Sequence, residues 1–246
     1  MDRTHQLSIR LLGGIALGRD GRPCKLAYEK GRALLAYLAA EPGRGHPRES
    51  LAAMFWPDLA REAALTNLRQ VLHDLRGVIN THSPAAPLLQ VSREAVCLKL
   101  ADGLEIDLTE FCTPATACPS APGPAHCSPC LARMEALVER YRGEFLAGFA
   151  LPDCQDFEAW LQVQREALHL RALALLTRLS DCHERVGDTQ KSLPFALRFH
   201  ALEPWNEVGL QRVMRLQTGI GQRATALATY QRCCETLKSE LGVLPG

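Results

Sequence analysis

The sequence predicts an α+β winged-helix domain followed by an all-α, TPR-like helical-repeat domain. Over the first 110 residues, short alternating strands, three amphipathic helices and a hairpin follow one another. The C-terminal part reads as helix throughout and carries a 34-residue repeat. A segment rich in cysteine and proline separates the two. We therefore expect a winged-helix domain at 1–110, a Cys/Pro-rich loop at 111–130 and a TPR-like domain at 131–246.

The elements of the N-terminal part follow from the spacing of apolar residues and from turn residues. Residues Leu7–Leu26 alternate apolar and polar positions around Gly13-Gly14 and predict short strands. Leucines three and four positions apart predict a long amphipathic helix that ends near Ile79. The expected order is strands within 7–26, helices at 29–40, from 47 to the residue before Pro57 and at 61–79, and a hairpin within 89–100.

The C-terminal part predicts helices at 131–145 and 156–186 and further helices up to 241. Gly187 and Gly221 lie 34 residues apart, and each follows one amphipathic helix and precedes another. This period is typical of TPR units, of which about two are clear. The helices at 131–145 and 157–170 are expected to pack as a degenerate unit, because a short array otherwise leaves an apolar face open.

Composition and charge exclude several classes of protein. No apolar run of about 18 residues and no signal-peptide h-region occur, which predicts a soluble, cytoplasmic protein without a membrane partner. The formal net charge is only +1, but nine Lys/Arg against four Asp/Glu in residues 1–48 leave a local excess of positive charge. No phosphate-binding loop, nucleophile–base pair or paired carboxylates are present, so we expect no enzyme.

The 61–79 helix carries a set of polar side chains suited to the major groove of double-stranded DNA. Removing its apolar positions leaves groups that can bind base edges or phosphates. Arg93 at the hairpin tip and Arg48 at the start of the second helix are expected to contact the DNA as well. Lys30 or Arg32 are further candidates for contacts with the DNA phosphate backbone. The helix contributes Thr66, Asn67, Arg69, Gln70, His73 and Arg76.

The Cys/Pro-rich loop predicts a structural zinc site. A CxxC pair lets two thiolates bind one metal ion. A proline-rich loop without a hydrophobic core gains stability from a bound metal ion that cross-links it. His126 is an alternative to one of the cysteines. A disulfide switch at the CxxC pair and a linker with no metal remain the competing interpretations. The four-thiolate set is Cys112, Cys118, Cys127 and Cys130.

With these residues in view, the chain resembles SARP-type transcriptional regulators that carry a bacterial transcriptional activator domain. The resemblance implies a winged helix that binds promoter DNA and a TPR-like domain that supports a homodimer on DNA and contacts RNA polymerase. It also implies that the chain can be a fragment of a larger regulator. The motifs that carry the resemblance are Leu11–Gly14, Gly31–Leu38, Phe55–Asp58, Asn67–Gln70, Leu75-Arg76, Tyr141–Leu146, Phe157–Trp160, Gln164–Glu166 and Glu240–Val243.

One hypothesis of another class competes with DNA binding. In it the chain is a TPR scaffold or sensor whose winged helix mediates protein interaction, as the near-neutral net charge suggests. The two hypotheses differ in their dependence on salt, because displacement of counterions from DNA makes binding fall steeply as salt rises.

Overall fold

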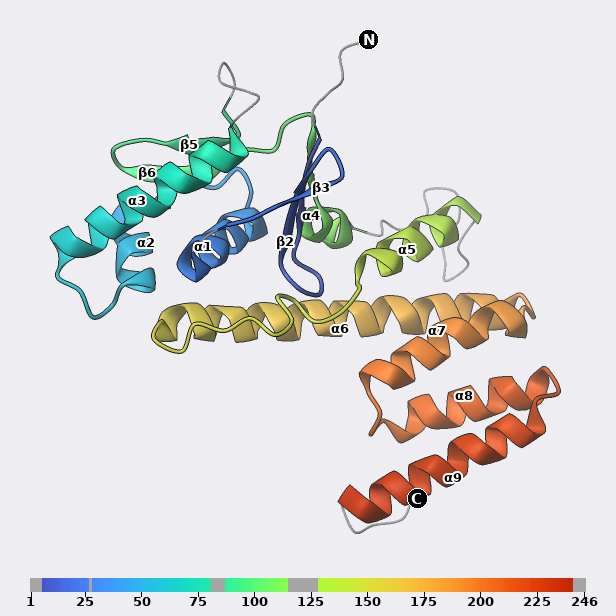
Figure 1. The fold of residues 1–246 in the computed structure, drawn as a ribbon. Helices are drawn as coiled ribbons and strands as arrows, with labels where there is room; N and C mark the ends of the chain where they lie inside the picture. The colour runs from blue at the N-terminus through green and yellow to red at the C-terminus, as the bar shows by residue number, and fades with distance from the viewer. Residues whose placement is uncertain (1–5, 27, 81–86, 115–127, 241–246) are drawn as a thin grey trace. The chain divides into compact units, whose positions relative to one another are not determined.

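The computed structural model describes residues 6–26, 28–80, 87–114 and 128–240, and its contacts divide the chain into two compact units. The first unit comprises residues 1–113 together with Arg140–Leu168, and the second comprises Pro114–Glu139 together with residues from His169 onward. Helices α5 (Ser128–Arg140) and α6 (Gln155–Arg185) therefore contribute residues to both units (Figure 1). These units differ from the domains predicted at 1–110 and 131–246, because Arg140–Leu168 packs with the N-terminal elements.

The first unit contains a four-stranded sheet in the order β3-β2-β1-β7. Strand β1 (Leu7–Arg10) pairs antiparallel with β2 (Ala16–Arg19) and parallel with β7 (Leu104–Ile106). Strand β3 (Arg22–Cys24) pairs antiparallel with β2 across Asp20-Gly21, where both residues have positive φ, as a tight two-residue hairpin turn requires. The strands expected within 7–26 are confirmed, whereas β7 was not expected from the sequence.

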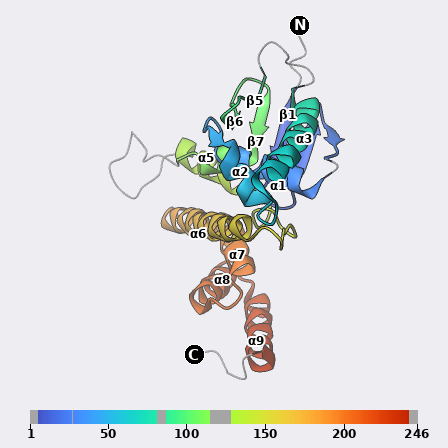
Figure 2. The same cartoon turned by 90° about the vertical axis from the view of Figure 1, so that its left-hand side faces the viewer.

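Three helices and a second, three-stranded sheet complete the winged helix. Helices α1 (Glu29–Ala40), α2 (Arg48–Phe55) and α3 (Arg61–Ile79) have the bounds that the sequence predicts to within a residue or two. The hairpin of β5 (Leu89–Val91) and β6 (Ala95–Leu98) lies beside α3 in Figures 1 and 2, and a short strand β4 (His46–Pro47) pairs with β6. The α+β winged-helix architecture is therefore confirmed.

The Asn80 side chain joins the end of α3 to the β5–β6 hairpin. Asn80 follows the last residue of α3, its amide nitrogen donates to the carbonyl of Leu89 at 3.0 Å, and its amide oxygen accepts from the Leu89 N–H at 3.0 Å. Below this junction the apolar faces of the helices meet, and Leu34, Leu38 and Leu68 are fully buried. Burial of this kind fixes which face of α3 remains exposed.

The helix expected at 131–145 ends earlier, at Arg140, and the expectation is corrected there. Residues 141–147 leave the helix and bind the loop after β1. Gly13 N–H donates to the carbonyl of Glu144 at 3.0 Å, and the N–H groups of Leu146 and Ala147 donate to the carbonyls of Leu11 and Gly13 at 2.9 and 2.8 Å. These hydrogen bonds give the carbonyl of Glu144 and the N–H groups of Leu146 and Ala147 partners in place of intrahelical ones.

The second unit is helical, with α7 (Thr189–Leu202), α8 (Glu207–Gly219) and α9 (Arg223–Glu240) following α6 as antiparallel neighbours in Figure 1. The 34-residue repeat is visible in its turns. Gly187 and Gly221 have φ of 76° and 84°, and their N–H groups donate to Glu184 and Thr218 at 3.0 Å in both turns. Equal offsets and equal geometry are what repeated helix–turn–helix units require, so the helical-repeat architecture is confirmed.

The Cys/Pro-rich loop lies largely outside the described residues, which include 111–114 and 128–130 of it. Cys112 is the last residue of α4 (Asp107–Cys112), and Cys130 lies in the first turn of α5, so both ends of the expected loop are helical. Within the described ranges, no helix combines the length and the apolar character needed to cross a membrane.

Candidate nucleic-acid interface

Helix α3 presents the six polar side chains expected from the sequence on its exposed face. Thr66, Asn67, Arg69, Gln70, His73 and Arg76 are all exposed. Leu68, Leu72 and Leu75 between them are buried, because positions three and four apart share one side of a helix. The geometry therefore leaves a continuous polar surface along the helix, as entry into a DNA groove requires.

Contacts within α3 hold some of these side chains only loosely. Thr66 Oγ1 donates to the carbonyl of Glu62 at 2.8 Å, and Arg69 Nη1 donates to Thr66 Oγ1 at 3.3 Å. Gln70 Nε2 donates to Asp74 Oδ1 at 3.2 Å. All three hydrogen bonds are exposed, and those of Arg69 and Gln70 are also long, so a base edge can replace these two at little cost.

Three of the six side chains have no hydrogen-bond partner among the residues that the structure describes. They are Asn67, His73 and Arg76. Their donors and acceptors face solvent, where a nucleic acid would meet them. Arg76 lies in the last turn of α3 and Asn67 in its first half, so these two side chains would reach different parts of a DNA groove.

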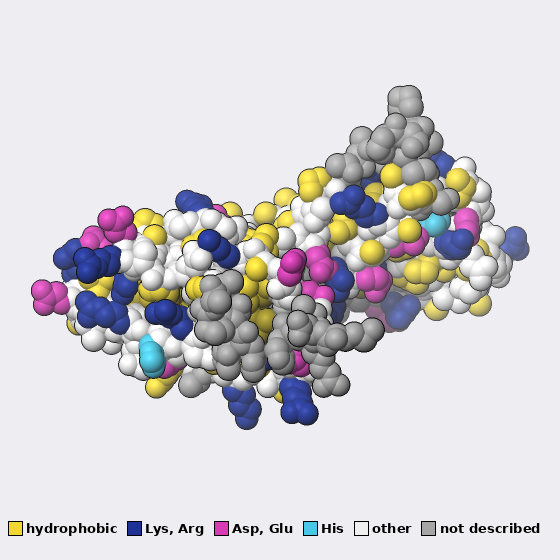
Figure 3. All heavy atoms as spheres, turned by 90° about the horizontal axis from the view of Figure 1, so that it is seen from above, with side chains coloured by type: hydrophobic (Ala, Val, Ile, Leu, Met, Phe, Trp, Pro, Cys, Tyr) yellow, Lys and Arg dark blue, Asp and Glu magenta, His cyan; other side chains and the backbone are white. Residues whose placement is uncertain are grey.

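Arginines from three elements surround one hollow of about 640 Å³ at the N-terminal end of α3. Arg48 comes from α2, Arg69 from α3 and Arg93 from the hairpin tip, so the structure brings together three residues that the sequence analysis selected separately. Arg61 joins them, and Glu49 and Glu94 also line the hollow. Four arginines against two glutamates leave this surface positively charged. Figure 3 shows Lys and Arg side chains gathered at the left-hand end of the face, with some acidic neighbours.

Arg61 was not selected from the sequence, although its spacing could have indicated it. Arg61, Leu65 and Arg69 follow one another at intervals of four, which places them on one side of α3, and all three line the hollow. The Arg61 guanidinium donates to Glu49 and forms an ion pair with it. Because both side chains are about two-thirds exposed, solvent screens this pair and it contributes little to stability.

The hairpin tip is a hydrogen-bonded turn that also contacts Arg48 of α2. Ser92 Oγ accepts from the N–H groups of Glu94 and Ala95 at 3.2 and 2.9 Å. Arg48 Nη1 donates to the carbonyl of Ser92 at 3.2 Å, and Arg48 N–H donates to the carbonyl of Glu94 at 2.9 Å. Arg48 therefore fixes the tip on which Arg93 is exposed.

Lys30 and Arg32, the two further candidates for contacts with the DNA phosphate backbone, bind residues of the first unit instead. Lys30 Nζ lies 2.9 Å from Asp153 Oδ2 and 5.7 Å from the centre of the Trp56 ring. The Arg32 guanidinium lies 5.5 Å from the centre of the Phe149 ring. Both cations contact the segment that follows α5, which the sequence analysis did not anticipate.

A buried histidine precedes two residues that line the hollow, Pro47 and Arg48. His46 is 4% exposed and stacks edge-on against Tyr37 with ring centres 5.0 Å apart. Its Nε2 has no hydrogen-bond partner among the described residues, and Glu41 Oε2 lies 3.7 Å away from it. Burial lowers the pKa of His46 below its usual value of 6.5, because the charged imidazolium is poorly solvated there; nearby Glu41 opposes this shift and Arg44 adds to it.

A buried carboxylate anchors the segment after α5 to the winged helix. Asp107 Oδ1 accepts from the Leu11 N–H at 2.8 Å, and Oδ2 accepts from the Leu12 N–H at 3.2 Å and from Arg142 Nη2 at 2.9 Å. Burial raises the pKa of the Asp107 carboxyl, while these three donors oppose the rise. Arg165 adds a second anchor, because its guanidinium donates to the carbonyls of Phe145, Leu146 and Phe149.

The expected zinc site stays a prediction. Cys118, His126 and Cys127 lie outside the described residues. Among the residues that are described, no group of three or more His, Cys, Asp or Glu side chains could hold a metal ion. Cys112 is exposed and Cys130 is half-buried.

Comparison with known proteins identifies a family, and it also finds similar solved structures. Residues 106–246 match the model of the bacterial transcriptional activator domain. The structure of Mycobacterium tuberculosis EmbR in complex with a low-affinity phosphopeptide is similar, with a TM-score of 0.67 and 20% sequence identity. The match covers 98% of this chain and 62% of that chain, and at this identity it shows a shared fold. No curated protein sequence matches the chain.

Proposed function

Since the chain belongs to the family of transcription regulators defined by the bacterial transcriptional activator domain, we propose that it activates transcription by binding promoter DNA through α3 and the β5–β6 hairpin. This family is not a family of enzymes, and it is the one that the sequence resemblance identified. The observation that carries the proposal is the surface formed by the exposed face of α3 and the arginine-lined hollow beside it.

The chemistry of the helix assigns roles along its length. Arg69 can donate two hydrogen bonds to O6 and N7 of guanine, and Asn67 or Gln70 can bind adenine in the same bidentate way. Each such pair discriminates against a wrong base by about 1–3 kcal/mol. Thr66 can contact guanine or adenine through its hydroxyl, or a thymine methyl group through its own methyl group. His73 and Arg76 lie further along α3 and are assigned to phosphates.

The hairpin is assigned to the neighbouring minor groove or its phosphates. Arg93 is exposed at the tip of a turn that Ser92 and Arg48 hold in place. A preorganised tip loses little conformational entropy on binding, so its arginine binds more tightly than one on a mobile loop. Arg48 therefore supports Arg93, and its remaining N–H donors can contact the DNA phosphate backbone.

The helical repeats are assigned to protein partners. Stacked helix–turn–helix units present extended surfaces that suit proteins rather than base pairs. We assign to this part the formation of a homodimer on DNA and the contact with RNA polymerase. A footprint that covers two half-sites, in place of one, would support the homodimer.

Fluorescence anisotropy with a labelled duplex from the regulator's own upstream region tests the proposal. Arg69→Ala is expected to weaken binding to this duplex about 10- to 100-fold, and to leave binding to an unrelated duplex nearly unchanged. Arg223→Ala is the matched control, because Arg223 is an exposed arginine at the start of α9. Equal binding by Arg69→Ala and the wild type would show that α3 does not read the bases.

Salt dependence separates DNA binding from the competing scaffold function. If about six phosphates are contacted, affinity falls on the order of 10³-fold between about 50 and 200 mM salt. A winged helix that served as a protein-interaction module would show neither this slope nor a preference for the upstream duplex. The acidic side chains of Glu49 and Glu94 at the hollow are the feature that favours this second function.

A further inference from the structure

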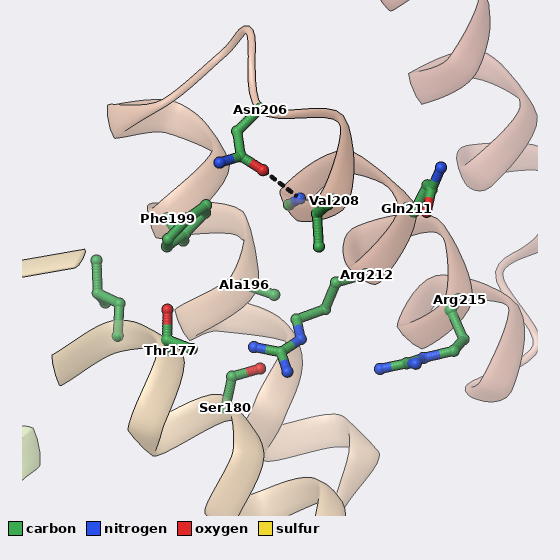
Figure 4. Close-up of a pocket in the computed structure, with 11 residues that line it drawn as sticks. Thr177, Ser180, Ala196, Phe199, Asn206, Val208, Gln211, Arg212 and Arg215 are labelled. Atoms are coloured by element: carbon green, nitrogen blue, oxygen red, sulfur yellow. Dashed lines mark hydrogen bonds between the residues drawn. The ribbon is translucent and has the colours of Figure 1, made fainter. Parts of the chain in front are cut away.

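The second unit contains a hollow of about 590 Å³ between α6, α7 and α8. Leu176, Thr177 and Ser180 of α6 form one wall, Ala196 and Phe199 of α7 a second, and the first half of α8 the third (Figure 4). This volume lies in the range of sites for small molecules, which are mostly apolar with a few polar groups. All of these residues belong to one compact unit.

The apolar side of the hollow is shaped by a glycine and an exposed valine. A Cβ atom on Gly209 would lie 2.8 Å from Cε1 of Phe199, so only glycine lets the phenyl ring lie this close to α8. Val208 is 75% exposed and points into the hollow in Figure 4. The ring and the valine offer apolar surface that a ligand can remove from water.

Thr177 has a hydroxyl whose usual partner is missing. The hydroxyls of Thr66, Thr218 and Thr229 donate to the carbonyl four residues earlier in their own helices. Thr177 makes no such bond and has no other hydrogen-bond partner among the described residues, and its hydroxyl points into the hollow (Figure 4). A half-buried helical hydroxyl in this state can bind a ligand atom at no loss of an existing bond.

The remaining polar groups favour a ligand that accepts hydrogen bonds. Ser180 Oγ lies 2.7 Å from Ser192 Oγ, and Ser192 Oγ donates to the carbonyl of Ser180, so both hydroxyl hydrogens are used. Arg212 bonds Asp181 through Nη2 and lies 3.3 Å from Glu184 through Nε, which leaves Nη1 as a donor at the hollow.

The charge balance limits what the ligand can carry. Arg212 and Arg215 are matched by Asp181 and Glu184, since Arg215 Nη2 donates to Glu184 Oε2 at 2.6 Å. The cluster has no formal excess of positive charge, which argues against a nucleotide or another multiply charged anion. A carbonyl or a single carboxylate suits one hydroxyl and one guanidinium donor.

We propose that this hollow binds a small amphipathic molecule with an apolar body and a carbonyl or carboxylate head. The body lies against Phe199 and Val208, and the head accepts hydrogen bonds from Thr177 and Arg212. This site is independent of the proposed DNA contacts, because no residue of α3 or of the hairpin takes part in it.

Calorimetric titration of the 246-residue chain with decanoate tests the site, and decyltrimethylammonium serves as a probe with the same tail but a cationic head that accepts no hydrogen bond. Decanoate is expected to bind saturably at one site, and the ammonium probe at least tenfold more weakly. Val208→Trp fills the hollow and is expected to weaken decanoate at least tenfold. Thr177→Val removes one donor at nearly constant volume and is expected to weaken it about two- to tenfold.

Val186→Trp is the matched control, because Val186 is 71% exposed and lies outside the hollow. It is expected to bind decanoate as the wild type does, and circular dichroism confirms that each variant is folded. Absence of saturable binding below about 10 mM, equal binding of the two probes, or equal effects of the two tryptophan variants would overturn the proposal. Unchanged binding by Thr177→Val would overturn the placement of the head group.

Discussion

Replacing Asp107 by alanine removes three hydrogen bonds from a buried carboxylate and tests how the segment after α5 is anchored. The N–H groups of Leu11 and Leu12 would be left buried without a partner, at about 1–2 kcal/mol each. Arg142 is 45% exposed, so losing its ion pair adds only about 0.5–1 kcal/mol after solvent screening. We expect the free energy of unfolding of the first unit to fall by about 2.5–5 kcal/mol.

Urea unfolding followed by tryptophan fluorescence measures this loss, because Trp56 and Trp160 belong to the first unit and Trp160 packs against Tyr37 at 4.8 Å. Asp102→Ala is the control, since Asp102 is exposed in the turn before β7, and it is expected to change stability by less than about 0.5 kcal/mol. If Asp107→Ala unfolds within about 1 kcal/mol of the wild type, the carboxylate does not anchor this segment.

Three further predictions concern pH, turn geometry and metal. The pKa of His46 is lowered in the folded state, so as pH falls below 6.5 the unfolded state binds a proton at this histidine before the folded state does. The free energy of unfolding should therefore fall over this pH range. His46→Phe should lack this part of the pH dependence in urea titrations. Gly221→Ala should cost about 1–2 kcal/mol at φ 84°, whereas Gly77→Ala in α3 should stabilise by about 0.5–1 kcal/mol; equal thermal shifts would contradict this reasoning. Native mass spectrometry should show one Zn²⁺ per chain, lost with a chelator and absent from a Cys127→Ser, Cys130→Ser double variant; a wild type with the mass of the bare chain would exclude the site.

Local patterns in the sequence were enough to place the helices of the winged helix. The bounds of α1 and α3 agree with the prediction because proline and turn residues limit both helices, and leucines at spacings of three and four fix the buried face of α3. The same spacing left Arg69 and its polar neighbours on the opposite side. The exposed face of the candidate interface could therefore be derived without coordinates.

Contacts between distant residues could not be derived in this way. The 131–145 stretch has a helical pattern up to Phe145, but Glu144 and Phe145 pair with Leu12 and Gly13, more than a hundred positions away. Asp107 is an ordinary acidic residue in the sequence, and only the fold shows that it is buried and binds Arg142. Such pairings depend on tertiary neighbours, about which local propensity carries no information.

The sequence by itself determined the class of each half, the exposed polar face of α3 and the 34-residue period, because each follows from residue spacing along one helix or turn. Only the tertiary structure decided that Arg48, Arg69 and Arg93 border one hollow, that Arg140–Leu168 packs with the winged helix, and that Thr177 and Val208 face another hollow. These features require several elements to meet in space, and their position is set by the packing of buried side chains rather than by any one segment.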